Sequence, residues 1–379
     1  RLDIVRLPST ARQPFLTFLI LDGMTLPVVN ARFLTQPITG VQRYAIEVSR
    51  RLRKMEPNIR FLTPHNVIHH DLFEELGAQV VGRRTGHLWD QLELSHHAGT
   101  APLINLCNSG PMFRRHQLVT FHDAAPFAVP QAYSRSYRLW YRFMMRRIGK
   151  AARIIATDSE FSRRELQSRI GIAGEKIEVV PLGHEHVHLQ PADATVIGRH
   201  DLGDRPFLLA VGSRSPHKNF GALLGALAKI GHCDFEIVIA GGVSPRIHAG
   251  VDLETKLPAN VRHVGFVTDS ELRALYEKAA AYVHPAYYEG FGLPPLEAMA
   301  LGCPVISSNA ASLPEVCGDA AVYFDPHDDA ALAEAIMTTM ADHELRRRLR
   351  IAGREQADRF AWDRTAERIL KLSRSIKAG

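Results

Sequence analysis

Short apolar runs alternate along this chain with longer segments in which apolar residues recur every three or four positions. Side chains repeat with a period of two along a strand and about 3.6 along a helix, so the runs predict strands and the longer segments predict helices. The predicted strands are residues 15–21, 117–121, 153–156, 176–180, 207–211, 235–240, 261–264, 281–284 and 304–307. The predicted helices are residues 40–54, 219–230, 269–280, 294–301 and 328–341, with another from Ser159. This alternation predicts an α/β architecture with parallel sheets covered on both faces.

The length of 379 residues predicts two domains, because single hydrophobic cores seldom grow beyond roughly 250–300 residues. A polar stretch at residues 191–204 separates two sets of strand–helix units. We therefore expect two Rossmann-like, doubly wound domains, at residues 1–190 and 205–360, joined by that linker. Ligands of such sheets bind at the carboxyl ends of the strands, which places the expected site in the cleft between the domains. Residues 361–379 are predicted to form a final amphipathic helix.

The composition, 46% hydrophobic and 23% charged, is that of a soluble globular protein. No apolar run reaches the roughly 18 residues that a membrane-spanning helix needs, and no signal-peptide pattern is visible. The four cysteines are scattered without a Cys-x-x-Cys pair, which favours reduced thiols over a disulfide frame or a zinc site. These features predict a cytoplasmic protein.

Positive charge is concentrated in one part of the chain, whose net charge is +6. Residues 124–157 contain no acidic side chain, and residues 133–153 combine seven cations with aromatic and apolar side chains at helical spacing. An aromatic face beside a cationic face is typical of a helix at an anionic membrane surface, here the inner membrane face. The alternative is a helix packed on the core with a solvated charged face.

The most informative motif places two carboxylates, Glu289 and Glu297, eight positions apart around a Gly-Phe-Gly turn and a Leu-Pro-Pro helix start. Glu297 is expected about one turn inside the helix, since Pro is favoured at the first helical positions. The free N–H groups and the dipole of a helix N-terminus favour an anion, whereas carboxylates suit hydroxyl groups. The motif therefore predicts a site for a molecule with a diphosphate and several hydroxyls, such as a nucleotide sugar.

Two cations, Arg214 and Lys218, follow a predicted strand and Gly212, just before a predicted helix. Cations and helix N-terminal amides together suit a diphosphate. The alternative is that both are solvated charges, the usual state of Arg and Lys. Gly241 and Gly242, which follow the next strand, either approach the nucleotide base or form a tight turn.

Candidate residues in the first half lie at the same expected edge. Gly40 opens a helix and permits close backbone approach to a phosphate or sugar, or is only a turn glycine. His122 follows the strand at 117–121, where it either hydrogen-bonds a substrate or is satisfied within its loop. In the second half, Glu315 lies either beside the nucleotide or at a helix N-terminus, where it stabilises the dipole.

The spacing of Glu289 and Glu297, with its Gly-Phe-Gly-Leu-Pro-Pro filling, resembles the Glu-x7-Glu signature of family 4 of the retaining GT-B glycosyltransferases. The other motifs follow the order of that family along nearly the whole chain. The resemblance implies a GT-B fold and transfer of a sugar from a nucleotide sugar with retention of anomeric configuration. It also implies a final helix that crosses back to the first domain, no metal ion and no cofactor.

The same resemblance implies roles for individual residues. Arg214 and Lys218 stabilise the leaving diphosphate, and His122 lines the sugar and acceptor side. Glu289 binds hydroxyls of the donor sugar, and Glu297 binds those of the ribose. The donor is further approached by Gly40, Gly212, Gly290, Phe291, Gly292 and Leu293.

Other classes of protein fit parts of the pattern. A glycosidase also uses paired carboxylates but has no diphosphate for Arg214 and Lys218 to hold. A nucleic-acid-binding protein needs a basic groove with stacking aromatics, and because only residues 133–153 qualify we expect no nucleic acid. A GT-B epimerase would share the fold, and a phosphorylase would need a pyridoxal phosphate lysine that the sequence does not identify.

A metal site is the other alternative. On a strand, His184, His186 and His188 would all face one way, as metal ligands could. No carboxylate or cysteine cluster supports them, and the Asp-x-Asp motif of metal-dependent GT-A enzymes is absent. We therefore expect no metal.

The donor sugar is suggested only by resemblance. The string His122-Asp123-Ala-Ala-Pro-Phe and the basic segment resemble bacterial mannosyltransferases that build O-antigen or exopolysaccharide on lipid carriers. This implies GDP-mannose as donor and a glycan or lipid-linked acceptor at the inner membrane face, in lipopolysaccharide synthesis. Galactose, glucose, rhamnose and N-acetylglucosamine donors, carried on UDP or dTDP, remain alternatives.

Overall fold

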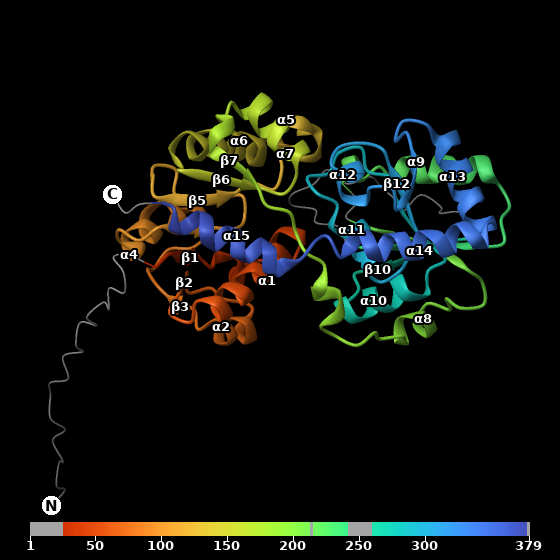
Figure 1. Ribbon diagram of the computed structural model, residues 1–379, viewed down its shortest axis with the longest axis horizontal. Coiled ribbons are helices and arrows are strands. Elements are labelled where there is room, and N and C mark those ends of the chain that lie inside the picture. The colour runs from red at the N-terminus through yellow and green to blue at the C-terminus, as the bar shows by residue number, and fades with distance from the viewer. Residues whose placement is uncertain (1–25, 213–214, 242–259, 377–379) are drawn as a thin grey trace, which may run out of the picture.

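The computed structural model describes residues 26–212, 215–241 and 260–376, which form two parallel sheets flanked by helices (Figure 1). The first sheet has seven strands in the order β3-β2-β1-β4-β5-β6-β7, and every neighbouring pair is parallel. They are β1 (Val28–Asn30), β2 (Arg60–Thr63), β3 (Gln79–Val80), β4 (Leu103–Asn105), β5 (Gln117–Thr120), β6 (Ile154–Thr157) and β7 (Ile177–Val179). The last three confirm predicted strands, whereas the strand predicted at residues 15–21 lies outside the described residues.

The helix predicted at residues 40–54 is present in the first half as α1. The helices of this half are α1 (Gly40–Met55), α2 (His70–Leu76), α3 (Gly86–Trp89), α4 (Ser95–Ala98), α5 (Ala125–Ala128), α6 (Arg135–Ala151) and α7 (Glu160–Glu165). Thr39 caps α1, because its backbone N–H donates to Gln42 Oε1 at 3.2 Å in a capping box. One face of α1, with Tyr44, Val48 and Leu52, is fully buried, as its apolar spacing predicts.

The second sheet has six parallel strands in the order β10-β9-β8-β11-β12-β13. They are β8 (Phe207–Val211), β9 (Glu236–Ala240), β10 (Val261–Gly265), β11 (Ala281–His284), β12 (Val305–Ser308) and β13 (Ala321–Phe324). Its helices are α9 (Phe220–Ile230), α10 (Asp269–Lys278), α11 (Leu293–Ala300), α12 (Leu313–Cys317), α13 (Asp329–Ala341) and α14 (His343–Ala357). All predicted strands and helices of this half are confirmed, while β13, α12 and α14 are additions.

The polar stretch expected to be a linker contains a short helix, α8 (Thr195–Arg199). Its Val196 is fully buried, and Arg199 forms an ion pair with Glu271 of α10. Leu202 is also buried and Ile197 packs against the same core, so three apolar side chains anchor this segment without producing a helical period in the sequence.

The chain passes between the two halves twice, and the two passages lie side by side. The first runs through the short 3₁₀ helix η6 (Glu185–His188), and the second joins α14 to α15 (Trp362–Arg374), which lies across the first half in Figure 1. The Glu185 carboxylate accepts the backbone N–H of Trp362 at 3.1 and 3.0 Å. A Cβ at Gly183 would lie 2.0 Å from the Trp362 nitrogen, so only glycine permits this approach.

The hydrophobic core joins the two halves. One apolar cluster contains Tyr44 of α1, Leu296 of α11 and Trp362 of α15, each fully buried. α15 packs along α1, and Thr365 donates its hydroxyl to the carbonyl of Pro181 at 2.6 Å. The final helix therefore belongs structurally to the first half.

Helix α6 turns its tyrosines inward, which corrects the expected aromatic membrane face. Tyr137 stacks on Tyr133 and Tyr141, with ring centroids 5.1 and 4.1 Å apart, and all three are half-buried. The outward face instead carries Leu139 and Phe143, which are 67% and 51% exposed. Among the described helices, none has the length and apolar character needed to span a bilayer.

Candidate active site

The two halves touch where β5 and β11 end. The turn His122-Asp123 after β5 lies against Gly290, where a Cβ would come within 2.5 Å of the His122 carbonyl oxygen. Ser159 and Ser162, at the start of α7, donate their hydroxyls to the Gly290 carbonyl at 2.7 and 2.9 Å. The predicted residues of the two halves are thus brought together at the carboxyl ends of both sheets.

Glu289 forms an ion pair with Lys218 beneath this contact. The Lys218 ammonium donates to Glu289 Oε2 at 2.6 Å, and both side chains are more than four-fifths buried. Burial alone would raise the pKa of Glu289, but the Lys218 ammonium and His284 outweigh it and hold that pKa well below its usual range. Glu289 is therefore a carboxylate ready to accept hydroxyl donors.

His284, the last residue of β11, is a site residue that the sequence reasoning missed. Its Nε2 lies 3.5 Å from Glu289 Oε2, and the Tyr282 hydroxyl lies 2.7 Å from its Nδ1. Burial and the nearby Lys218 cation lower the pKa of His284, so the ring is neutral. Its Nε2 is buried and lacks a hydrogen bond. Its position at the carboxyl end of a strand was the available signal.

The turn that carries Lys218 is fixed by its neighbour. Asn219 adopts a left-handed conformation with φ of 59°, and its side-chain amide donates to the carbonyls of Pro285 and Pro326 at 3.1 and 2.8 Å. Gly212 lies near this turn, since a Cβ there would be 3.8 Å from the Lys218 side chain. The predicted partner cation, Arg214, lies outside the described residues, as does Gly242.

The turn after Glu289 leads into α11 as predicted. Gly292 precedes the helix with φ of 110°, and Phe291 and Leu293 on either side are buried. The Ser312 hydroxyl lies 2.8 Å from the carbonyl oxygens of both Glu289 and Phe291. This contact from the next loop holds the backbone of the predicted donor-binding turn.

Glu297 lies one turn inside α11 and connects the site to the passage between the halves. The ring of His186 contacts its Oε1 through Nε2 at 2.9 Å, and Tyr276 donates its hydroxyl to Oε2 at 3.3 Å. Trp362 donates its indole N–H to His186 Nδ1 at 3.0 Å, so His186 must donate from Nε2. A carboxylate accepts about four hydrogen bonds, so Glu297 keeps acceptor capacity for the predicted ribose hydroxyls.

The histidine run does not form the strand on which a metal site would depend. His186 and His188 belong to the helical turn η6 and His184 precedes it, so the rings of His184 and His188 lie 6.2 Å apart while His186 is directed to other partners. Both ring nitrogens of His186 are engaged by Glu297 and Trp362. Across the described ranges, no three His, Cys, Asp or Glu side chains converge as metal ligands.

His122 is buried with both ring nitrogens bound to the protein. Its Nδ1 lies 2.7 Å from Asp158 Oδ2, and its Nε2 lies 3.0 Å from the Leu106 carbonyl oxygen. Burial alone would lower the pKa of His122, but the adjacent Asp158 carboxylate raises it. The ring therefore fixes the turn after β5, and in this conformation no nitrogen is available to a substrate.

The remaining predicted positions differ in what surrounds them. Gly40 begins α1, but a Cβ there would meet no atom within 4 Å, so nothing in the described structure requires glycine. Glu315 accepts the backbone N–H groups of Glu160 and Phe161 at 2.9 and 3.3 Å. Glu315 thus stabilises a helix N-terminus, which was the alternative to a position beside the nucleotide. The helix it stabilises is α7, in the other half.

Asp123 is a titratable residue at the contact with Gly290 that was not among the predicted site residues. Its Oδ1 accepts the Ala125 N–H at 2.8 Å. Burial, with a smaller contribution from the Glu289 charge, raises the pKa of Asp123 from 3.8 to about 6. Near the contact between the halves there is therefore one carboxylate that ionises readily, Glu289, and one that resists ionisation, Asp123.

This difference predicts a pH-dependent stability. A raised folded-state pKa stabilises the fold below pH 3.8, and this contribution is lost as the pH rises through about 6. The variant Asp123→Asn stays neutral at every pH. As the pH rises from 4 to 7, its free energy of unfolding should therefore increase relative to that of the unaltered protein, by on the order of 1–3 kcal/mol. This follows because one pKa unit corresponds to about 1.4 kcal/mol. Urea unfolding at several pH values measures the difference. A constant difference across this range would contradict the assignment.

Two family profiles match consecutive parts of the chain. Residues 38–187 match the profile described as Glycosyltransferase Family 4, and residues 197–356 match Glycosyl transferases group 1. Among curated proteins, O-antigen chain mannosyltransferase B of Escherichia coli is 27% identical over 86% of this chain and 93% of its own length. O-antigen chain mannosyltransferase RfbU of Salmonella typhimurium is 28% identical over 82% of this chain and 89% of its own.

Solved structures share the fold at low sequence identity. Sucrose-phosphate synthase from Thermosynechococcus elongatus aligns over 92% of this chain and 98% of its own, with a TM-score of 0.71 and 21% identity. Anabaena HepE, solved with UDP-glucose, has a TM-score of 0.70 at 15% identity, over 92% of this chain and 99% of its own. WaaG, a glycosyltransferase involved in lipopolysaccharide biosynthesis, has a TM-score of 0.67 at 18% identity, over 94% and 100% of the two chains.

Proposed function

Because the chain belongs to the family 4 glycosyltransferases and has their GT-B fold, we propose that it transfers mannose from GDP-mannose to a lipid-linked or oligosaccharide acceptor in bacterial surface polysaccharide synthesis. The named O-antigen mannosyltransferases support the sugar and the pathway class. A UDP- or dTDP-sugar is the alternative donor, and the likeness to HepE, solved with UDP-glucose, keeps it open.

The ion pair between Lys218 and Glu289 carries this proposal. A bound donor places its diphosphate near the Lys218 ammonium and its sugar hydroxyls near the Glu289 carboxylate, so each charge gains a ligand of suitable chemistry. As the bond from sugar to diphosphate breaks, negative charge grows on the leaving phosphate, and a fixed cation stabilises that charge. Together with Arg214, Lys218 takes the role that a metal ion has in other transferases. The reaction proceeds with retention and needs no metal.

The acceptor enters along the stacked tyrosines of α6. Tyr133, just before α6, has its pKa raised by burial and by the charges of Asp123 and Glu289, and Tyr137 and Tyr141 of α6 continue the stack. Tyrosine offers an apolar ring face and a polar hydroxyl, which suits a sugar chain. We expect the outward face of α6, with the exposed Leu139, Phe143 and flanking arginines, to contact the anionic inner membrane that presents a lipid-linked acceptor.

Thermal unfolding in the presence of nucleotides tests the donor site. GDP and GDP-mannose should raise the melting temperature more than UDP or dTDP compounds, because a ligand that binds only the folded state stabilises it. EDTA should leave the shift unchanged. A larger shift with a UDP or dTDP compound would show that the donor is not GDP-mannose. Loss of the shift in EDTA would overturn metal independence. No shift with any nucleotide would count against the assigned site.

A further inference from the structure

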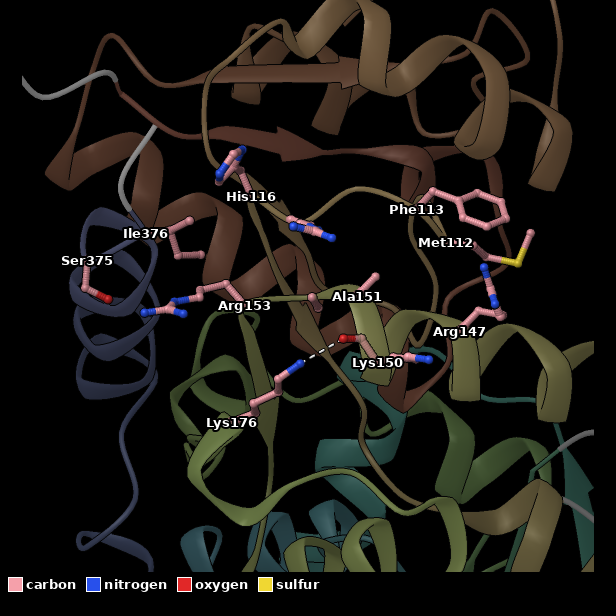
Figure 2. Close-up of a pocket in the computed structure, with 12 residues that line it drawn as sticks. Met112, Phe113, His116, Arg147, Lys150, Ala151, Arg153, Lys176, Ser375 and Ile376 are labelled. Carbon is pink, nitrogen blue, oxygen red and sulfur yellow. Dashed lines mark hydrogen bonds between the residues drawn. The ribbon is translucent and has the colours of Figure 1, made fainter. Parts of the chain in front are cut away.

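A cavity of about 800 Å³ lies in the first half, at the amino ends of β5 and β6 (Figure 2). Basic side chains from four segments of the chain line it. These are Arg115 and His116 before β5, Arg147 and Lys150 at the end of α6, Arg153 before β6, and Lys176 before β7. Among the described residues that line the cavity there is no carboxylate.

The cavity is separate from the candidate active site. His122 follows the carboxyl end of β5, whereas Arg115 and His116 precede its amino end. A strand of four residues spans about 13 Å, at a rise of about 3.3 Å per residue. The sheet therefore lies between the two places, and one ligand cannot fill both.

The backbone that carries these charges is held in place. Arg114 donates to the carbonyls of Ser95, Gly99 and Ala101, which fixes the turn before β5. The Arg153 N–H donates to the Arg115 carbonyl at 3.1 Å, so the two residues lie on adjacent strands at one edge. The cations are therefore brought together by the fold, not by mobile loops.

The positive charge of the cavity is not neutralised by the protein around it. Throughout the part of the chain that the structure describes, the five Lys and Arg residues of the lining form no ion pair with a carboxylate. Lys176 instead donates to the Lys150 carbonyl at 2.8 Å, and the Arg147 guanidinium lies 4.8 Å from the centre of the Phe113 ring. Like charges held close repel one another, so an anion that enters gains attraction from several sides.

The chemistry of the lining identifies the anion. Guanidinium groups bind phosphate oxygens through paired N–H donors, and ammonium groups add point charge. Met112, Phe113 and Ile376 supply apolar surface at the same cavity. Along α6, Leu139, Phe143 and Arg147 are spaced by four residues, so the outward apolar face continues into the cavity.

We infer that this cavity is a second, non-catalytic site that binds a phosphate monoester, either as the headgroup of an anionic lipid or as a free phosphorylated compound. The site does not depend on the reaction proposed above. The double variant Arg115→Gln/Arg153→Gln removes two exposed charges from its rim. The matched control Lys229→Gln/Lys278→Gln removes the same net charge from exposed positions of the other half.

Two binding measurements test the inference and separate the sources. In the first, calorimetry with glycerol 3-phosphate should show binding that is weakened at least about tenfold, or about 1.4 kcal/mol, by Arg115→Gln/Arg153→Gln. Neither the charge-matched control nor Lys218→Ala should weaken it. In the second, flotation with vesicles containing phosphatidic acid should show the same loss for the cavity variant alone, with little binding to phosphatidylcholine vesicles.

Each outcome has a distinct meaning. A cavity-specific loss with glycerol 3-phosphate supports the site for free phosphate esters, and a cavity-specific loss only with vesicles supports a lipid headgroup. An equal loss of binding in the cavity variant and the control would show that only the net charge of the protein matters, and this would overturn the inference. Loss of glycerol 3-phosphate binding in Lys218→Ala would place the phosphate in the catalytic cleft and equally overturn it. Failure of the proposed donor site would leave both measurements unaffected.

Discussion

Lys218→Ala is expected to lower kcat by on the order of 10²–10³-fold, the cost of removing one group that stabilises charge in a transition state. The ammonium now lies 2.6 Å from Glu289 Oε2, and its loss leaves that largely buried carboxylate beside the neutral His284 without its cation. The pKa of Glu289 should then rise, because Lys218 is the main influence that lowers it. Turnover of GDP-mannose by the purified protein measures the effect.

Glu289→Gln is the partner variant, because it keeps the size of the side chain and removes the charge. It should also lose most of the turnover, while thermal unfolding shows that the fold is kept. Lys229→Ala, an exposed lysine of α9, serves as the control and should retain activity. Full activity in Lys218→Ala and Glu289→Gln would rule out the assignment of this pair to the reaction.

The second large effect concerns stability. Trp362→Ala should lower the free energy of unfolding by about 3–5 kcal/mol, the usual cost of deleting a buried aromatic side chain. Trp362 is fully buried in the cluster shared by both halves, and its indole N–H donates to His186. The change therefore removes packing and a hydrogen bond from the passage between the halves. Urea unfolding, followed by far-ultraviolet circular dichroism, measures it.

Trp362→Phe separates the two contributions. It keeps most of the ring volume and removes the donor, so the loss attributable to the hydrogen bond should be about 0.5–1.5 kcal/mol. The decrease in the free energy of unfolding should be clearly smaller for Trp362→Phe than for Trp362→Ala. If both variants unfold at the urea concentration of the unaltered protein, the role assigned to this crossing is wrong.

The elements that could be predicted from the sequence are those with a long periodic pattern or with turn residues at both ends. All predicted elements of the second half, and α1, β5, β6 and β7 of the first, are present with ends shifted by at most two residues. β4 has three residues and β3 has two, which is too short for an alternating pattern to show. The GT-B fold expected from the resemblance is confirmed by the solved structures.

The candidate site was predictable where it depended on local motifs and not where it depended on long-range contacts. Glu289 and Lys218 were identified from their own turns, and the fold brings them together. His186 was considered only for a metal, because its partners Glu297 and Trp362 are 111 and 176 residues away. No local pattern encodes such pairings, which arise only when both sheets and the final helix are in place.

The contact at Gly290 has a mechanical consequence. This residue is where the predicted donor-binding turn of one half meets the carbonyl of His122 in the other, and a single methyl group would already come within 2.5 Å of that oxygen. The glycine at position 290 therefore adds no side-chain volume between the two halves. A larger side chain would push the two halves apart at the contact beside the proposed donor site.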